Sequence, residues 1–343
     1  MVDCSIIILT YNSAPDITDT LDAAKDQRTT LSYEFVVADN NSSDRTVEII
    51  RKAYPDVEVI EHQENWGSSK GYNKALKHAD GDYVVYLNPD TTVHRDWLQN
   101  LYSGLRESDA DAAMSSVFEP GDEGYAPDER TGSKDLMKVK DVATTGYVYN
   151  GEHEMVDHAV RTLHLAGNSM MFDASVFDEL SHAFEEAFFL FADDIDIALR
   201  LNVLGKRVIM VPDAIVYHHQ RARADPTMSV WLAKKHIWAL SGRLLSFYKN
   251  MYLSEYLLAL PLLIAGGILN ARALKGEPAK QTLYAVGGIF LTGLCFLLLL
   301  ARFRDVRSHR NEILAKRCRG RFWLLRKMVG STPPRLDWSI TAK

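Results

Sequence analysis

The sequence predicts an α/β protein, in which a mostly parallel, doubly wound sheet is followed by an α-helical region rich in apolar residues. Two observations predict the sheet: short runs of β-branched and aromatic residues, and segments of helical spacing between them. A third predicts the helical region, because after residue 228 the chain becomes rich in tryptophan and leucine and contains long uncharged runs. A chain of 343 residues is long enough for both parts.

The first 90 residues alternate between strands and helices. The predicted strands are Ser5–Leu9, Glu34–Ala38, Val57–Ile60 and Tyr83–Leu87, and the predicted helices are Ile17–Ala24, Thr46–Ala53 and Tyr72–His78. Strands that alternate with helices at this pace form parallel sheets, in which the strand ends meet at one edge. Each strand here is followed by a polar cluster, so this edge is the predicted site.

The segment from Tyr83 to Thr92 is the most informative of these. Its first half is an uncharged run typical of a strand buried on both faces, and Pro89 cannot donate to a sheet ladder. Asp90 is therefore expected just past the end of the strand. A carboxylate there can hold a divalent cation against a phosphate, although Asn-Pro-Asp is also ordinary turn chemistry.

A second informative stretch, Phe188–Leu204, contains a predicted helix that begins with Asp193, Asp194 and Asp196. Acids near a helix N-terminus are stabilised by the helix dipole, which accounts for one or two acids better than for three. The neighbouring predictions are a long loop at Phe118–Met155, a strand with a glycine break at His164–Phe172, and short strands at Val208–Val211 and Ala214–Tyr217, followed by His218-His219.

Several classes of protein are disfavoured. The turn Thr10–Ser13 after the first strand lacks glycine, which argues against a nicotinamide cofactor. The three cysteines are far apart and predict neither a disulfide framework nor a zinc site. Eight arginines and two lysines lie between residues 302 and 327 against two acids. This basic segment follows an apolar run, which favours a membrane surface over nucleic acid as its partner.

Taken together, these segments resemble the family 2 glycosyltransferases of GT-A fold, in particular their rhamnosyltransferase-like branch. Five segments carry the resemblance in the family's order and at roughly its spacing: Ser5–Asn12, Val36–Asp44, Asn65–Ala75, Asp82–Thr92 and Phe188–His218. The resemblance covers about the first 220 residues and implies a GT-A catalytic domain at residues 1–225.

The resemblance also implies how a nucleoside-diphosphate sugar is held. The implied donor-binding residues are Thr10, Tyr11, Asn12, Asp39, Ser42, Gly71, Asn73, Asn88 and Asp90. The family's Asp-x-Asp motif reads here as Asn88-Pro89-Asp90, so that Asp90 is the implied ligand of Mg²⁺ or Mn²⁺ and His218 the implied second ligand. The loss of the first acid leaves this metal site with fewer fixed charges.

For the chemical step, the resemblance implies Asp194 as the catalytic base, with Asp193, Gly167 and Asn168 on the acceptor side. A base of this kind takes the proton of the acceptor hydroxyl as that hydroxyl attacks the anomeric carbon with inversion. The Gln-x-x-Arg-Trp motif of processive synthases is missing, because residues 220–224 lack the tryptophan. Transfer of a single sugar is therefore expected.

The C-terminal third is predicted to attach the enzyme to a membrane. Residues 226–250 are expected to form an amphipathic interfacial helix, with a helix docked on the catalytic domain as the alternative. Residues 251–303 are expected to form a transmembrane hairpin with spans at Tyr256–Ala271 and Leu283–Ala301. Residues 304–343 then form a basic cytoplasmic tail that obeys the positive-inside rule.

The sequence thus predicts a multi-pass membrane enzyme whose catalytic domain lies on the cytoplasmic face. Its partners would be a nucleoside-diphosphate sugar, a lipid-linked saccharide or cell-surface glycan and the lipid bilayer, with no nucleic acid. Two alternatives stay open. One is transfer onto a polyprenyl or dolichyl phosphate, and the other is an inactive, membrane-anchored scaffold that binds sugar nucleotides.

Overall fold

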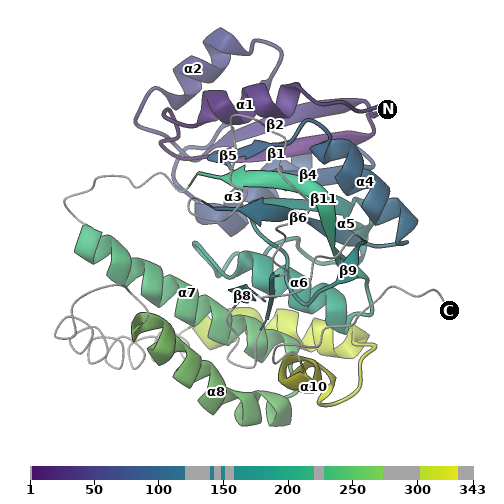
Figure 1. The fold of residues 1–343 in the computed structure, drawn as a ribbon. Coiled ribbons are helices and arrows are strands. Elements are labelled where there is room, and N and C mark those ends of the chain that lie inside the picture. Colours follow the sequence, from purple (N-terminus) through teal and green to yellow (C-terminus); the bar gives the residue numbers. More distant parts are fainter. Residues whose placement is uncertain are drawn as a thin grey trace.

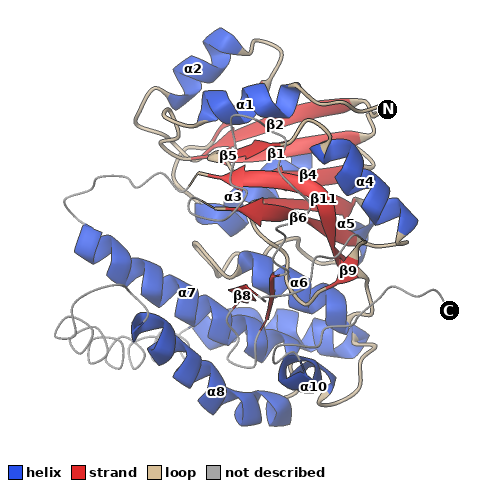
Figure 2. Cartoon of the chain, in the orientation of Figure 1, coloured by secondary structure: helices blue, strands red, loops and turns tan. Residues whose placement is uncertain are grey.

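The computed structural model describes residues 2–119, 140–142, 148–150, 158–219, 228–272 and 302–330. One large sheet occupies the upper part of the molecule in the view of Figure 1, and the helices of the C-terminal third gather below it. Figure 2 shows that helices flank the sheet. The predicted division into a sheet-forming part and a helical part is therefore visible in the fold.

The N-terminal half of the sheet is parallel, as predicted. Its strands are β1 (Cys4–Thr10), β2 (Tyr33–Asp39), β3 (Glu58–Glu61) and β4 (Tyr83–Leu87), in the spatial order β3-β2-β1-β4. The connecting helices are α1 (Ile17–Lys25), α2 (Thr46–Ala53) and α3 (Gly67–Ala75), with a 3₁₀ turn at Leu76–His78. Helix α3 begins five residues before the predicted Tyr72, and the Gly67 amide at this earlier start donates a hydrogen bond to the Asn65 side chain at 2.9 Å.

The other half of the sheet makes it mixed, which corrects the prediction of a mostly parallel sheet. The order continues as β10-β6-β11-β5, formed by Ser169–Asp173, Ala112–Phe118, Val208–His218 and Thr91–Val93. Strand β10 is antiparallel to both β4 and β6, and β11 is parallel to β6 but antiparallel to β5 and to β9 (Val160–Arg161). The two short strands predicted after residue 207 are one strand, β11, with a shift of register between Val211 and Ile215.

The long loop predicted at residues 118–155 lies mostly outside the described residues. Its described parts pair as a small antiparallel sheet of β7 (Lys140–Val142) and β8 (Val148–Asn150). The segment therefore contains regular structure that the sequence did not indicate.

Two apolar cores cover the two faces of the sheet, because side chains alternate along each strand. On one face, Ile6 and Ile8 of β1 pack with α1 and with α4 (Trp97–Glu107). On the other face, Ile7 and Leu9 pack with α3 and with α6 (Asp193–Val203). A short helix, α5 (Ser175–Glu179), also contributes to this second core. The site at the sheet edge thus rests on a strand packed on both sides.

A third core joins the C-terminal helices to helix α6 (Asp193–Val203). Helices α7 (Met228–Asn250), α8 (Leu253–Arg272) and α10 (Trp323–Gly330), together with the helical segment 302–316, bury apolar side chains against α6. Leu199 of α6 and Leu240, Leu244 and Phe247 of α7 are fully buried there. In Figure 1, α7 runs alongside α6. This arrangement matches the alternative of a helix docked on the catalytic domain, whereas the domain boundaries themselves stay a prediction.

The prediction of a multi-pass membrane protein is corrected by the structure. None of the helices in the described ranges is both long and apolar enough to cross a bilayer. The first expected span falls in α8, where Glu255 is buried in the protein and Tyr256, Ala259 and Leu263 pack into the third core. The second expected span, Leu283–Ala301, lies outside the described residues.

Arginines of the basic segment have structural partners. Arg310 donates to the carbonyls of Tyr248 and Met251 at 2.9 and 2.8 Å, at the end of α7. Arg317 forms a bidentate pair with Glu255 at 2.9 and 3.2 Å, and both side chains are fully buried. These arginines therefore bind free carbonyls at the C-terminus of α7 and a buried carboxylate. The pattern of charges in the sequence does not reveal either partner.

This pair leads to a stability prediction. Replacing Arg317 with Met leaves Glu255 buried without its bidentate partner, and breaking a buried pair in this way costs about 3–5 kcal/mol. We expect Arg317→Met to lower the free energy of unfolding by that amount in urea titrations. The control is Arg304→Met, at an exposed position of the helical segment 302–316, which precedes Arg317. Equal stability of the two variants would contradict the prediction.

Candidate active site

The sheet topology gathers the polar strand ends at one edge. Strands β1, β2, β4, β6 and β11 all end at this edge, because β10 lies antiparallel between β4 and β6 and leaves those two parallel. For the same reason the residues that precede β10, Gly167 and Asn168, arrive at the edge where the other strands end. The site therefore combines residues from both halves of the chain.

At the end of β2, Asp39 is buried and tightly bonded. Its carboxylate accepts hydrogen bonds from Thr10 Oγ1 (2.7 Å), from the Ser42 amide (2.7 Å) and from Ser42 Oγ (2.5 Å). The Asn12 amide in turn donates to Ser42 Oγ at 2.8 Å. Asn12 has a left-handed backbone (φ 52°), which an asparagine tolerates. The structure thus brings together four of the predicted donor-binding residues in one network.

Three further predicted donor residues lie differently. Tyr11 is exposed, with 42% of its surface accessible. Gly71 packs closely against Leu9, where a Cβ would lie 2.8 Å from the end of the leucine side chain, so a larger residue here would displace that side chain. The amide of Asn73 is bonded at both ends to the backbone of Phe184, at 2.8 and 2.9 Å. Asn73 therefore ties α3 to the segment before α6.

Beyond β4, the structure pairs Asp90 with His218. His218 Nε2 lies 3.3 Å from Asp90 Oδ2, and His218 Nδ1 lies 3.8 Å from a carboxylate oxygen of Glu119. Burial opposes protonation of this imidazole. The hydrogen bonds and charges of the two carboxylates outweigh burial and raise the pKa of His218 to about 9. The pair sits at the ends of β4 and β11, as the sequence predicted.

Asn88 lies between this pair and the second group of acids. Its backbone amide donates to the Asn168 carbonyl at 3.0 Å, and its side-chain oxygen accepts a hydrogen bond from the Tyr72 hydroxyl at 3.3 Å. Burial is the largest cause that raises the pKa of Tyr72, and the charges of Asp193, Asp90 and Asp194 add to it. The phenol therefore stays a neutral hydrogen-bond donor among acids.

The second group is Asp193 and Asp194 in the first turn of α6. Burial is the largest cause of a raised pKa in both carboxyls, and the negative charge of Asp193 adds to it at Asp194, whose pKa rises to about 7. Hydrogen bonds act in the opposite direction. The Ile195 amide donates to Asp194 Oδ1 at 2.7 Å, and Ser68 bonds to Asp193. Asp194 can therefore take up or release a proton near neutral pH.

Gly167 and Asn168 connect the two groups of acids. A Cβ on Gly167 would lie 3.3 Å from Asp194 Oδ2, and the Gly167 backbone bonds to that carboxyl. The next residue, Asn168, accepts the hydrogen bond from Asn88. The start of β10 thus sets the spacing between the Asp90 pair and the α6 acids.

Four residues of the site were missed by sequence reasoning: Ser68, Tyr72, Glu119 and Arg243. Glu119 follows β6, a strand that was not predicted, so the sequence did not indicate that this residue lies at the edge of the sheet. Arg243 is on α7, and its charge lowers the pKa of Asp194. Nothing in the sequence connects that helix with the acids of α6.

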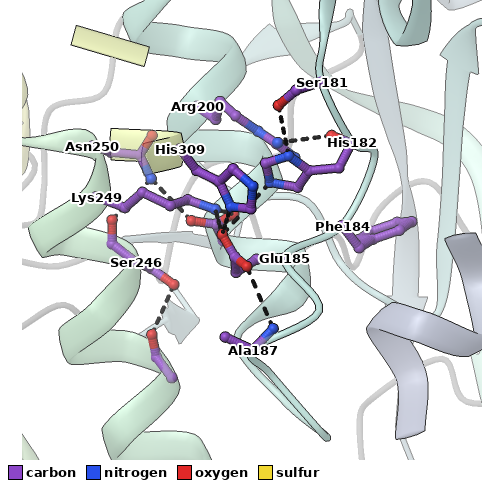
Figure 3. A network of polar contacts seen from close by, with 12 residues as sticks. Ser181, His182, Phe184, Glu185, Ala187, Arg200, Ser246, Lys249, Asn250 and His309 are labelled. Carbon is purple, nitrogen blue, oxygen red and sulfur yellow. Dashed lines mark hydrogen bonds and ion pairs between the residues drawn. The ribbon is translucent and has the colours of Figure 1, made fainter. Parts of the chain in front are cut away.

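Next to α6 lies a buried polar cluster (Figure 3). Within the described residues, His182, Glu185 and His309 form one group whose ligand atoms all lie within 4.8 Å of one another, as a metal site requires. Glu185 already has other partners, since Lys249 Nζ lies 3.0 Å and His309 Nδ1 lies 2.9 Å from the same oxygen. Burial raises the pKa of Glu185, but its hydrogen bond with His182 and the charge of Lys249 outweigh burial and hold that pKa well below its usual range.

Comparison with known proteins gives a family. The sequence model described as "Glycosyl transferase family 2" matches residues 5–180. The glycosyltransferase AglE of Haloferax volcanii is 31% identical over 141 residues, which are 40% of this chain and 46% of AglE. The low-salt glycan biosynthesis hexosyltransferase Agl10 of the same organism is 25% identical over 275 residues, or 77% of this chain and 82% of Agl10.

Solved structures show the same fold. The crystal structure of GalNAc-T7 with UDP, GalNAc and Mn²⁺ matches with a TM-score of 0.58 and 14% identity, covering 84% of this chain and 54% of that one. The catalytic part therefore has a GT-A-like α/β fold, with the mixed sheet described above. The matched sequence spans less than half of AglE, so what the relatives act on is a guide to this chain and not a property of it.

The raised pKa of Asp194 predicts how stability depends on pH. Between its ordinary value of 3.8 and about 7, the folded carboxyl holds a proton that the unfolded chain releases, so the wild type loses stability as pH rises through this window. Asp194→Asn removes the effect. We expect the difference in free energy of unfolding between Asp194→Asn and the wild type, in favour of the variant, to grow from pH 5 to pH 7 and to stay constant above pH 7. Urea titrations in EDTA at each pH measure this, and a constant difference would contradict it.

Proposed function

Because the chain belongs to glycosyl transferase family 2, we propose that it transfers a sugar from a nucleoside-diphosphate sugar to a hydroxyl group of a glycan. One observation carries this proposal. Asp194, a carboxyl with a pKa near 7, lies at the sheet edge that also bears the Asp90–His218 pair and the Asp39 network. In this proposal, the base for the acceptor and the place for the donor diphosphate lie at one edge of the sheet.

The Asp39 network supports the donor half of the proposal. Its hydroxyls and carboxylate are polar partners for a nucleoside, and the exposed Tyr11 ring offers a surface for the base. GalNAc-T7, which shares the fold, was crystallised with UDP. We propose that this end of the edge holds the base and ribose, and that the diphosphate extends from it toward Asp90.

Asp90 and His218 have the donor types that suit Mg²⁺ or Mn²⁺, a carboxylate oxygen and an imidazole nitrogen. Their atoms are 3.3 Å apart, close enough to share one ion, and Glu119 adds a second carboxylate nearby. A divalent ion held there would supply positive charge to the leaving diphosphate. The neutral Asn88 and Tyr72 then serve to orient polar groups of the donor without adding charge.

Asp194 supports the acceptor half. A general base works best when its pKa is near the working pH, and burial beside Asp193 gives Asp194 such a value. In the proposed step, the acceptor oxygen bonds to the anomeric carbon as the bond to the diphosphate breaks, and the hydroxyl proton passes to Asp194. Attack from the face opposite the diphosphate inverts the configuration at that carbon.

The proposal also includes the acceptor class, the branch of the family and the number of sugars transferred. We propose a lipid-linked or cell-surface glycan as the acceptor, in line with the glycan named for Agl10. The order of the motifs supports the rhamnosyltransferase-like branch. The missing Trp in residues 220–224, which lie outside the described residues, supports transfer of one sugar at a time.

A first experiment tests the base. Asp194→Asn keeps the shape of the side chain but cannot accept the proton, and general bases contribute about 10²- to 10⁴-fold. We expect kcat for transfer to fall by that factor while binding of the UDP-, dTDP- or GDP-sugar that the wild type uses, measured by calorimetry, is kept. Full activity of the variant would contradict Asp194 as the base. Transfer to a phosphate acceptor needs less deprotonation, so a small loss there would point to that alternative.

A second experiment tests the metal pair. We expect EDTA to abolish transfer and Mn²⁺ or Mg²⁺ to restore it. Asp90→Asn and His218→Gln should each lower kcat/KM by at least about a hundredfold, since charge stabilisation by a metal is worth several kcal/mol. The matched control is His78→Gln, at a histidine on the protein surface. Transfer that continues unchanged in EDTA would rule out the metal-dependent mechanism.

A further inference from the structure

Helix α7 carries a row of contacts along one face. Trp238, Gly242, Ser246 and Lys249 follow one another at spacings of four, four and three residues, which places them on one side of the helix. We call this row the α7 stripe. Each of its members touches the segment that leads into α6 or the first turn of α6, as the following contacts show.

The segment before α6 has an unusual backbone. Phe191 and Ala192 both have left-handed conformations, with φ of 67° and 65°, directly before Asp193 and Asp194. Such conformations cost about 1–3 kcal/mol at residues other than glycine and persist only where the surroundings impose them. The carbonyl of Ala192 also accepts the hydrogen bond of the Asp196 amide that opens α6. The turn therefore fixes where the α6 acids begin.

The α7 stripe imposes this turn from one side. A Cβ on Gly242 would lie 2.9 Å from the Cβ of Ala192 and 3.3 Å from the Phe191 carbonyl. The Trp238 ring lies 4.9 Å from the Phe189 ring, and Ser246 Oγ lies 3.4 Å from the Ala192 carbonyl. A glycine inside a helix costs about 1 kcal/mol relative to alanine, so its presence at position 242 fits a need for close approach.

At the C-terminal end of α7, Lys249 contacts residues on both sides of the Phe191–Ala192 turn, and Figure 3 shows its contact with Glu185. The Lys249 ammonium is fully buried between Glu185 (3.0 Å) and Asp196 (2.5 Å), eight residues before and three residues after Asp193. Asn250 adds a hydrogen bond to Asp196 at 3.0 Å. One cation thus contacts two buried carboxylates, one on either side of the strained turn.

From these contacts we propose that the α7 stripe positions the catalytic base, so that the C-terminal helices are part of the machinery of transfer and not an appendage to it. The proposal rests on the role proposed above for Asp194. The residues of the stripe are positioning residues, because they act on the base through the Phe191–Ala192 turn. A displacement of reacting groups by about 1 Å can cost a hundredfold in rate, which sets the scale of the expected effect.

The test variant is Gly242→Ala. Alanine favours the helix, so the protein should fold, but its methyl group must push against Ala192. We expect kcat to fall about 10- to 100-fold while the affinity for the donor sugar nucleotide, measured by calorimetry, changes less than twofold. The matched control is Gly320→Ala, where a Cβ would meet nothing within 4 Å. Lys249→Met should lower kcat in the same way where it folds.

A second readout separates this proposal from the proposed function. Hydrogen exchange of residues 186–199 should become faster in Gly242→Ala and stay at the wild-type rate in Gly320→Ala, whether or not a sugar is transferred. If the wild type transfers no sugar, the proposed function fails, and the exchange rates still decide whether the α7 stripe holds the turn. Wild-type exchange in Gly242→Ala, or a kcat within twofold of that of Gly320→Ala, would overturn the proposal.

Discussion

The buried ammonium of Lys249 is the interaction on which the catalytic half of the structure depends. Glu185 and Asp196 are each almost completely buried, and buried carboxylates are costly unless each has a charged or hydrogen-bonding partner. Lys249 comes from α7, so the C-terminal helices supply the cation that contacts the first turn of α6. The acids of the site and the helices after residue 228 are therefore joined through buried ion pairs.

The sheet imposes the second constraint. A purely parallel sheet would leave the start of each strand far from the edge that binds ligands. By running antiparallel between β4 and β6, β10 instead brings Gly167 and Asn168 to that edge, in contact with Asp194 and Asn88. The spacing between the Asp90 pair and the α6 acids is thus set by main-chain contacts, which hold position better than long side chains would.

Local signals allowed most elements of the first 90 residues to be predicted from sequence. Tyr83–Leu87 is a strand in the structure with the predicted bounds, because an uncharged β-branched run before a proline admits few other conformations. Asp90 and His218 also lie close together at the strand ends, 3.3 Å apart, while their role as metal ligands stays a prediction. Sequence reasoning missed the antiparallel β10 and the contacts of Tyr72 and Arg243, because these depend on which elements meet in space. Asn73 looked like a donor ligand, yet its amide spans two segments of the fold.

The C-terminal third shows why a charge pattern can mislead. Apolar runs flanked by arginines satisfy the positive-inside rule, but arginines are equally suited to capping helix ends and pairing with buried carboxylates. Arg310 binds carbonyls at the end of α7 and Arg317 pairs with Glu255, an acid that would be costly in a lipid-facing helix unless paired in this way. A membrane hairpin and helices packed on the protein differ in where the acid that pairs with these arginines lies. Glu255 lies within α8 itself, two residues after its start, and that single acid is the feature that separates them.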